Sequence, residues 1–365
     1  MSRTKHAAAV LIACKDGEKT IGDAVRSAAG QADVYVVSDG STDGTVEAAA
    51  AAGARVLVRD HSGGKPDALR AGIGAFSLAA RYRYIAVLDD DTTLEPQYVE
   101  KVVDAMERDP GIAAASGRID SVWDHQRRWN PFVAMRAFMY WSYQVTVKRG
   151  QNALRVVNVI CGANSVFRAD VFEQLIRDDA PYAIDDMYWL AEIIRRRLGR
   201  IAYVHRARSW TIDPHTLRDW YRQTVRWSWG QFQSIRGHRL GVPVQRNADK
   251  RLRFSWFDAA YLALLLDWLP YMLEPLLLPP IAYFFRGLVD PIWFFVYYFA
   301  MSTAWIAIGA CALRKPRLVL LVPAILVLDL VYRFTMLHAF VKTLLQPRIE
   351  VCKWDSPTRF QVGER

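Results

Sequence analysis

The sequence predicts an α/β fold, with a mostly parallel sheet in its first part and an α-helical membrane domain after it. First, apolar β-prone runs alternate with amphipathic helical patterns, as in a sheet covered by helices on both faces. Second, residues 84–88 have the pattern of a buried strand and lead directly into three aspartates, 89–91. Third, apolar and aromatic residues dominate the range 254–345.

Each expected element has its own local signal. Turn-forming glycines or carboxylates follow the strands, and the helices carry apolar residues on one face. We expect strands at 8–13, 34–38, 55–58, 84–89 and 156–160, and helices at 20–29, before 52, at 63–80, at 96–107 and from 169 onward. Residues 7–14 also resemble a short signal sequence ending in Leu-Ile-Ala-Cys, but we interpret them as the first buried strand.

Composition favours a membrane partner over nucleic acid. The net charge is +10, but the basic residues form no single long patch. They flank apolar segments at 127–128, 251–253 and 314–317, as they do at the cytoplasmic ends of membrane segments. The four cysteines are scattered without metal-binding spacing, which indicates reduced thiols.

The aspartates after the strand at 84–89 predict a metal site. Side chains alternate along an extended chain, so Asp89 and Asp91 point to the same side. Two carboxylates at the carboxyl end of a parallel strand suit Mg²⁺ or Mn²⁺, and such an ion suits a diphosphate. The other interpretation is an acidic turn in which Asp91 or Thr92 caps a helix.

Two further residues are candidates for nucleotide binding. Asp39 ends the second expected strand, where a carboxylate can accept hydrogen bonds from a base or ribose; a turn-forming role explains it as well. Lys65 follows Gly63 and Gly64 at a helix start, where backbone N–H groups and one cation can meet phosphate.

Two segments later in the chain suggest an acceptor site and a base. Cys161 and Gly162 follow an expected strand, and small residues there allow a bulky ligand to approach, although a tight turn has the same composition. Asp185 and Asp186 open an expected helix, and either carboxylate can act as a general base. Complementing the helix dipole is the structural alternative.

A third candidate patch lies on an expected helix. Gln223, Arg226 and Trp227 stand at i, i+3 and i+4, so they share one face. A guanidinium can neutralise a diphosphate, and an indole can stack on the apolar face of a sugar ring. Interfacial anchoring is the alternative for the tryptophan.

The domain boundaries follow from hydropathy. We expect a cytosolic catalytic domain at 1–240, with amphipathic interface helices near 127–149 and 215–236. A basic linker at 241–255 should precede two transmembrane helices within 256–313. The third apolar segment, 314–345, is expected to be interfacial or re-entrant, or to cross the membrane. The tail at 346–365 is expected to be cytosolic.

Taken together, these motifs resemble the membrane-integrated, processive family 2 glycosyltransferases, which include hyaluronan, chitin, cellulose and poly-N-acetylglucosamine synthases. The resemblance implies a GT-A catalytic fold with a Rossmann-like, mostly parallel sheet. It implies that the donor is bound by Asp39, Lys65, Asp89, Asp91, Gln223 and Arg226, the metal by Asp91 and Asp89, and the acceptor by Cys161, Gly162, Asp185 and Trp227. Asp186 and Arg226 would be catalytic. A weaker tail match involves Trp354, Thr358 and Arg359.

The resemblance further implies an inverting, metal-dependent polysaccharide synthase. It would move sugar from a UDP-sugar to a glycan acceptor, as a multi-pass protein of the plasma or inner membrane whose catalytic domain faces the cytoplasm. Nucleic acid is not an expected partner. Some relatives carry membrane helices before the catalytic domain; here none is expected, so self-association or a partner would complete an export channel. A single transfer to a lipid or protein, and a non-catalytic sugar-nucleotide-binding scaffold, are the other readings.

Overall fold

The computed structural model describes residues 7–124, 127–237 and 290–349, together with short pieces between 272 and 287. The predicted linker at 241–255 lies outside these residues, as does most of the predicted first membrane helix. The tail residues Trp354, Thr358 and Arg359 also lie outside them.

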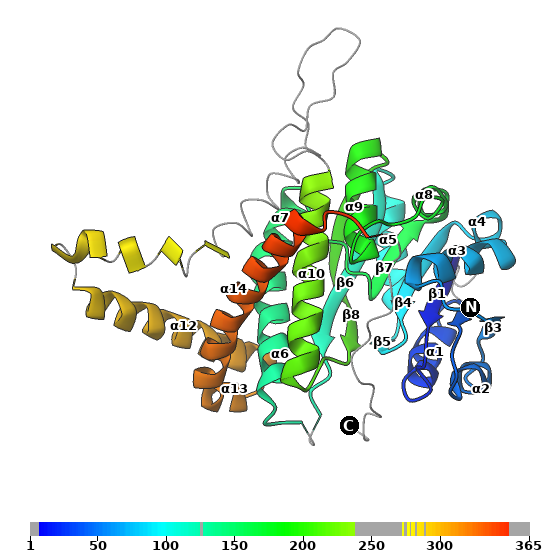
Figure 1. The fold of residues 1–365 in the computed structure, drawn as a ribbon. Coiled ribbons are helices and arrows are strands. Elements are labelled where there is room, and N and C mark those ends of the chain that lie inside the picture. The colour runs from blue at the N-terminus through cyan, green and yellow to red at the C-terminus, as the bar shows by residue number, and fades with distance from the viewer. Residues whose placement is uncertain are drawn as a thin grey trace, which may run out of the picture.

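An eight-stranded mixed sheet forms the centre of the fold, in the order β3-β2-β1-β4-β7-β6-β8-β5 (Figure 1). Its strands are β1 (Ala8–Cys14), β2 (Asp33–Asp39), β3 (Arg55–Arg59), β4 (Tyr84–Asp89), β5 (Thr92–Leu94), β6 (Ile112–Ser121), β7 (Asn164–Arg168) and β8 (Arg200–Thr211). The four strands from β3 to β4 are parallel, as predicted. β7 runs antiparallel to β4 and β6, and β5 antiparallel to β8, so the sheet is mixed.

The strand predicted at 156–160 is wrong, because the segment is a loop in the structure. Its apolar side chains do enter the core, with Val157 and Ile160 buried. The next segment forms β7 instead, and both edges of β7 already pair with β4 and β6. A buried apolar run therefore has no free strand edge to join here, which periodicity alone does not reveal.

Helices cover both faces of the sheet. They are α1 (Ile21–Ala29), α2 (Thr45–Ala51), α3 (Lys65–Ala75), α4 (Leu78–Arg81), α5 (Tyr98–Arg108), α6 (Pro131–Tyr143), α7 (Arg149–Ala153), α8 (Ala169–Leu175), α9 (Asp185–Arg196) and α10 (Leu217–Gly237). A π-helical turn, η2 (Gln144–Lys148), joins α6 to α7. The helix predicted at 63–80 divides into α3 and α4 because Ser77 adopts a left-handed conformation, with φ of 50°.

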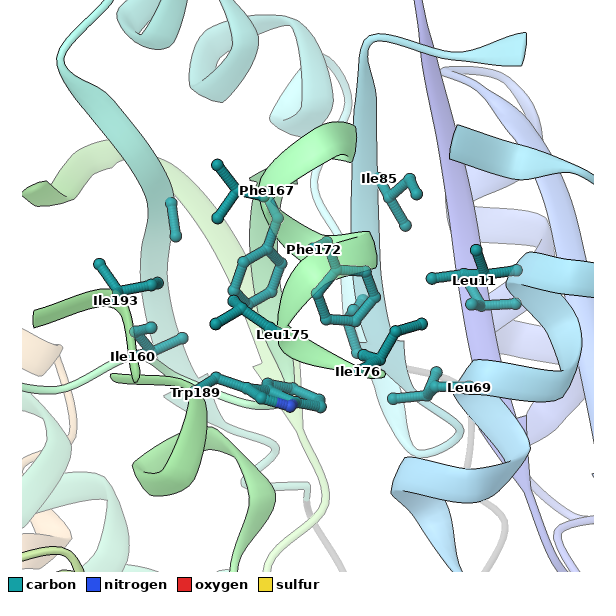
Figure 2. Packing of buried hydrophobic residues seen from close by; sticks show 14 of the residues in the cluster. Leu11, Leu69, Ile85, Ile160, Phe167, Phe172, Leu175, Ile176, Trp189 and Ile193 are labelled. Carbon is teal, nitrogen blue, oxygen red and sulfur yellow. The ribbon is translucent and has the colours of Figure 1, made fainter. Parts of the chain in front are cut away.

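Successive side chains of β1 point to opposite faces of the sheet and enter two separate hydrophobic cores. Leu11 faces the core beneath α3, α8 and α9, whereas Val10 and Ile12 face the core that includes α1 and α5. Figure 2 shows the first core, in which Phe167, Phe172 and Trp189 pack together with ring centres 4.5–5.7 Å apart. These two cores hold the carboxyl ends of the strands in fixed positions.

A third apolar cluster joins the catalytic part to the C-terminal helices. α10 packs along α14 (Val322–Leu345), and α6 contacts both α14 and α12 (Pro291–Leu313); Figure 1 shows α14 beside α10. A short helix, α13 (Arg317–Leu320), lies between α12 and α14. Within the residues that the structure describes, two stretches are long and apolar enough to cross a membrane, Phe295–Leu313 and Val322–Leu345. The third predicted apolar segment is thus a continuous helix for most of its length.

Candidate active site

A cavity of about 340 Å³ lies between the strand ends and a wall formed by α6 and α10. Segments far apart in the sequence meet there. The structure brings together all but one of the predicted catalytic, donor and acceptor residues of the described chain, and their side chains or backbone line this cavity: Lys65, Asp89, Asp91, Cys161, Gly162, Asp185, Asp186, Gln223, Arg226 and Trp227. The exception is Asp39.

The sheet side of the cavity is formed by the end of β4. Lys65 Nζ donates to Asp89 Oδ1 at 2.6 Å and to the carbonyl oxygen of Gly162 at 3.2 Å. Burial alone would lower the pKa of Lys65, but the charges of Asp89, Asp185 and Asp186 together outweigh burial and raise the net pKa, so this amine stays charged. Asp91 is nearly buried and accepts hydrogen bonds from Thr92 and from Thr211 at the end of β8, each at 3.3 Å.

Asp39 lies at the end of β2 and is fully buried outside the cavity lining. It accepts from Arg59 at 2.7 Å, from the Ser62 hydroxyl at 2.9 Å and from the Gly64 N–H at 2.9 Å. These bonds hold the loop that leads into Lys65. The structure therefore gives Asp39 a loop-ordering role, and contact with the nucleotide base stays a prediction.

Asp186 stands at the start of α9 and faces the loop that follows residue 160. Its Oδ2 accepts the Gly162 N–H at 3.1 Å. Its Oδ1, like Oδ2 of Asp185, has no hydrogen-bond partner in the described part of the chain. Burial and the adjacent Asp185 charge raise the pKa of Asp186 to about 7, although Lys65 opposes the shift. A carboxylate with this pKa is suited to accept a proton near neutral pH.

The helical side of the cavity carries the predicted patch on α10. Gln223, Arg226 and Trp227 all line the cavity. Gly230 lets the next turn of α10 approach α9 closely, because a Cβ at that position would lie 2.2 Å from Ile184 Cγ1. Ile184 immediately precedes the acidic pair, so this contact sets the distance between the helical patch and the carboxylates.

Sequence reasoning missed a row of polar residues on α6 and η2. Arg136, Tyr140, Gln144 and Lys148 line the cavity at four-residue spacing. Four residues exceed one α-helical turn, and the wider π-helical turn at 144–148 helps keep Lys148 on the same face. Burial lowers the pKa of Lys148. The four-residue spacing within the predicted amphipathic helix was the available signal.

Asp213 was also missed. It follows β8, lines the cavity, and accepts hydrogen bonds from Tyr140 at 2.9 Å and from Ser121. Burial raises the pKa of its carboxyl. No sequence motif marked this residue, because its role depends on the meeting of β6, β8 and α6.

A mixed sheet with aspartates at the end of a central parallel strand faces a helical wall across one cavity, where the described residues predicted from the resemblance to family 2 glycosyltransferases meet, apart from Asp39. The match of residues 9–176 to the family described as Glycosyl transferase family 2 supports this directly. Residues 9–176, slightly less than half of the chain, therefore carry a family 2 glycosyltransferase domain.

Sequence similarity also relates the chain to curated polysaccharide synthases. The chain is 23% identical over 237 residues to a poly-beta-1,6-N-acetyl-D-glucosamine synthase of Staphylococcus epidermidis, and 24% identical over 246 residues to that of Staphylococcus aureus strain COL. Each match covers 60% of this chain and 53% of the relative. The chain thus spans about half the length of the curated relatives it matches.

One solved structure supports the fold over most of the chain. It is the mannosyltransferase PcManGT from Pyrobaculum calidifontis, in complex with GDP-Man and Mn²⁺. The TM-score is 0.56 at 16% identity, and the match covers 92% of this chain and 86% of that one. The likeness therefore extends beyond the catalytic domain into the C-terminal helices.

Proposed function

We propose that this protein is an inverting, metal-dependent polysaccharide synthase, which moves a sugar from a UDP-sugar to the hydroxyl group of a growing glycan at the membrane. The observation that carries the proposal is that Asp91, Asp186 and Trp227, from three distant segments, line one cavity. The similarity to poly-beta-1,6-N-acetyl-D-glucosamine synthases supports a polymeric product.

The carboxylates at the end of β4 fit a divalent cation. The described residues contain no group of three His, Cys, Asp or Glu side chains that could hold a metal ion by themselves. Mg²⁺ commonly binds through one or two carboxylates plus substrate phosphates, so Asp89 and Asp91 match the protein share of such a site. Mg²⁺ or Mn²⁺ held there would supply positive charge to the departing diphosphate.

The reaction needs a base and a cation from the protein. Asp186 takes the proton of the acceptor hydroxyl while that oxygen forms a bond to the anomeric carbon of the donor. The bond from this carbon to the phosphate oxygen breaks on the opposite face, so UDP leaves and the configuration inverts. Arg226 stabilises the negative charge on the diphosphate. Trp227 and the Cys161-Gly162 loop hold the acceptor sugar.

The C-terminal helices support a membrane location. α14 packs on α10, so the helix that carries Gln223, Arg226 and Trp227 touches a segment able to cross a bilayer. We propose a multi-pass protein of the plasma or inner membrane with its catalytic domain in the cytoplasm, where UDP-sugars are made. A second copy or another protein would complete an export path.

A donor screen tests the proposal. The protein, purified in lipid nanodiscs, is incubated with candidate UDP-sugars and with Mg²⁺, Mn²⁺ or EDTA, and the products are sized by mass spectrometry. The proposal predicts transfer that EDTA abolishes and a ladder of oligosaccharides. A product one sugar longer than the acceptor would favour the single-transfer reading. UDP-sugar binding without transfer would favour the scaffold reading and contradict the proposal.

A further inference from the structure

The side chain of Arg136 occupies a hole on one face of α10. Its guanidinium carbon lies 4.3 Å from the ring centre of Trp227 and 5.5 Å from that of Trp220. Its Nη2 donates to Gln223 Oε1 at 3.1 Å and to Thr224 Oγ1 at 2.7 Å. These partners stand at i, i+3, i+4 and i+7 on α10, which is the four-residue hole that receives one side chain from a facing helix.

This cation is buried without an ion pair. Arg136 exposes none of its surface, and no carboxylate pairs with it among the residues that the structure describes. Its Nε and Nη1 have no hydrogen-bond partner there either. Burying an unpaired guanidinium opposes folding, and an apolar side chain of similar length would fill the hole without that cost.

A guanidinium makes directional hydrogen bonds that orient its partners, which an apolar side chain cannot do. One guanidinium nitrogen, Nη2, donates to both Gln223 and Thr224 and so fixes where the Gln223 amide oxygen lies, while the guanidinium carbon lies over the Trp227 indole. Gln223 and Trp227 are the two members of the hole that line the cavity, whereas Trp220 and Thr224 are fully buried beneath it. The contact therefore links the interior of the helix pair to the surface where substrate binds.

We propose that Arg136 is a positioning residue for sugar transfer, which orients Gln223 and Trp227 toward the cavity from a helix outside their own. The inference rests on the proposed function. Arg226 is not part of the hole, so its placement against the diphosphate does not depend on Arg136. Trp227 belongs to the predicted acceptor set and Gln223 to the predicted donor set, so loss of Arg136 should reduce the use of both substrates. UDP itself, held by the proposed contacts with Asp91 and Arg226, should bind as before.

The test compares Arg136→Met with a matched control, Arg168→Met. Arg168 also donates to neighbours, the carbonyl groups of Ile112 and Met106, and lies over the Tyr84 ring, but it is outside the cavity lining. We expect Arg136→Met to lower kcat/KM for the acceptor about tenfold or more, with the Kd for UDP unchanged within about twofold. Arg136→Lys keeps the charge without the fork and should not restore the rate. Arg168→Met should lower only the Tm.

A double-mutant cycle with Trp227→Ala gives a readout that a purely structural role would not produce. If Arg136 acts through the indole, Arg136→Met should cost no more than about a further twofold in kcat/KM once Trp227 is Ala. Losses that multiply would overturn the inference, as would kinetics like those of the Arg168→Met control. If the wild-type enzyme transfers sugar but the variants give one of these contradicting results, only the inference about Arg136 fails and the proposed function stands. A wild-type protein that transfers no sugar contradicts the proposed function, and with it this inference.

Discussion

The two walls of the cavity are held by different forces. On the sheet side, charged groups pair directly, as in the 2.6 Å contact of Lys65 with Asp89 and the 2.7 Å contact of Arg59 with Asp39. On the helical side, Arg136 and Arg226 form no ion pair within the described chain. Arg136 instead lies against aromatic rings, an amide and a hydroxyl.

This difference indicates a division of labour. The sheet wall consists of charges that can rearrange around a cation and a diphosphate, so its substitutions should change nucleotide and metal affinity. The helical wall is fixed by packing between α6, α10 and α14. Substitution of Trp227 on this wall should change acceptor use and leave nucleotide affinity alone, whereas Gln223 and Arg226 on the same wall belong to the proposed donor site. Asp186, at the start of α9, lies where the two walls meet.

The largest effect is expected at that meeting point. Asp186→Asn removes the proposed base with little change in shape and should lower kcat by about 10²- to 10⁴-fold. The Kd for UDP with Mn²⁺, measured by calorimetry, should stay within about twofold. Asp178→Asn is the control, because Asp178 is exposed and, within the described chain, forms an ion pair with Arg196. A wild-type rate in Asp186→Asn would refute the base assignment.

The next prediction compares one substitution on each wall of the cavity. Trp227→Ala should raise the KM for the acceptor about tenfold or more and shorten the products, because a sugar loses its stacking surface. Asp91→Asn should instead weaken UDP binding in the presence of Mn²⁺ and leave binding without metal unchanged. Equal losses of nucleotide affinity in both variants would show that the division of the walls is wrong.

A smaller effect is expected at Gly230, which sets the distance between the walls. The Cβ of an alanine would lie 2.2 Å from the Ile184 side chain, so Ile184 or α10 must shift. We expect Gly230→Ala to lower kcat about tenfold, since misplaced groups reduce transfer even when all are present. Gly150→Ala is the matched control, because nothing lies within 4 Å of a Cβ there. Unchanged kinetics in Gly230→Ala would show that the spacing is not critical.

The last prediction concerns the dependence of the rate on pH instead of a substitution. A base must be deprotonated to act, so the raised pKa of Asp186, about 7, predicts that kcat/KM rises with pH and levels off above about pH 7. The same shift means that the folded protein binds this proton more tightly than the unfolded chain. It therefore makes stability fall as pH rises between about 4 and 7. A rate that is constant from pH 5 to pH 8 would contradict the shift.

Much of the sheet wall was predictable because its signals are local. A buried apolar run followed by aspartates fixes Asp89 and Asp91 at a strand end, and Gly63-Gly64 before Lys65 marks a helix start. The pairing of β7 was not predictable, because antiparallel insertion between β4 and β6 depends on long-range contacts. The strand was wrongly predicted at 156–160 for the same reason, because the pairing partners of a strand cannot be read from the local sequence.

The helical wall was predictable only in part. The spacing of Gln223, Arg226 and Trp227 is visible along one helix, so their shared face followed from sequence. Arg136 was not among the predicted site residues, since its partners lie 87 and 88 residues away. Asp39 lies at the predicted strand end, where its carboxylate is engaged by its own loop, and its contact with a nucleotide base stays a prediction.

The most direct test of the account is a structure of the protein bound to UDP and Mn²⁺ in a nanodisc. The account predicts that Mn²⁺ is bound by Asp91, that Arg226 contacts the diphosphate, and that Asp186 and Trp227 face the same chamber. Nucleotide bound elsewhere on the sheet, with Asp186 and Trp227 turned away from it, would contradict the account.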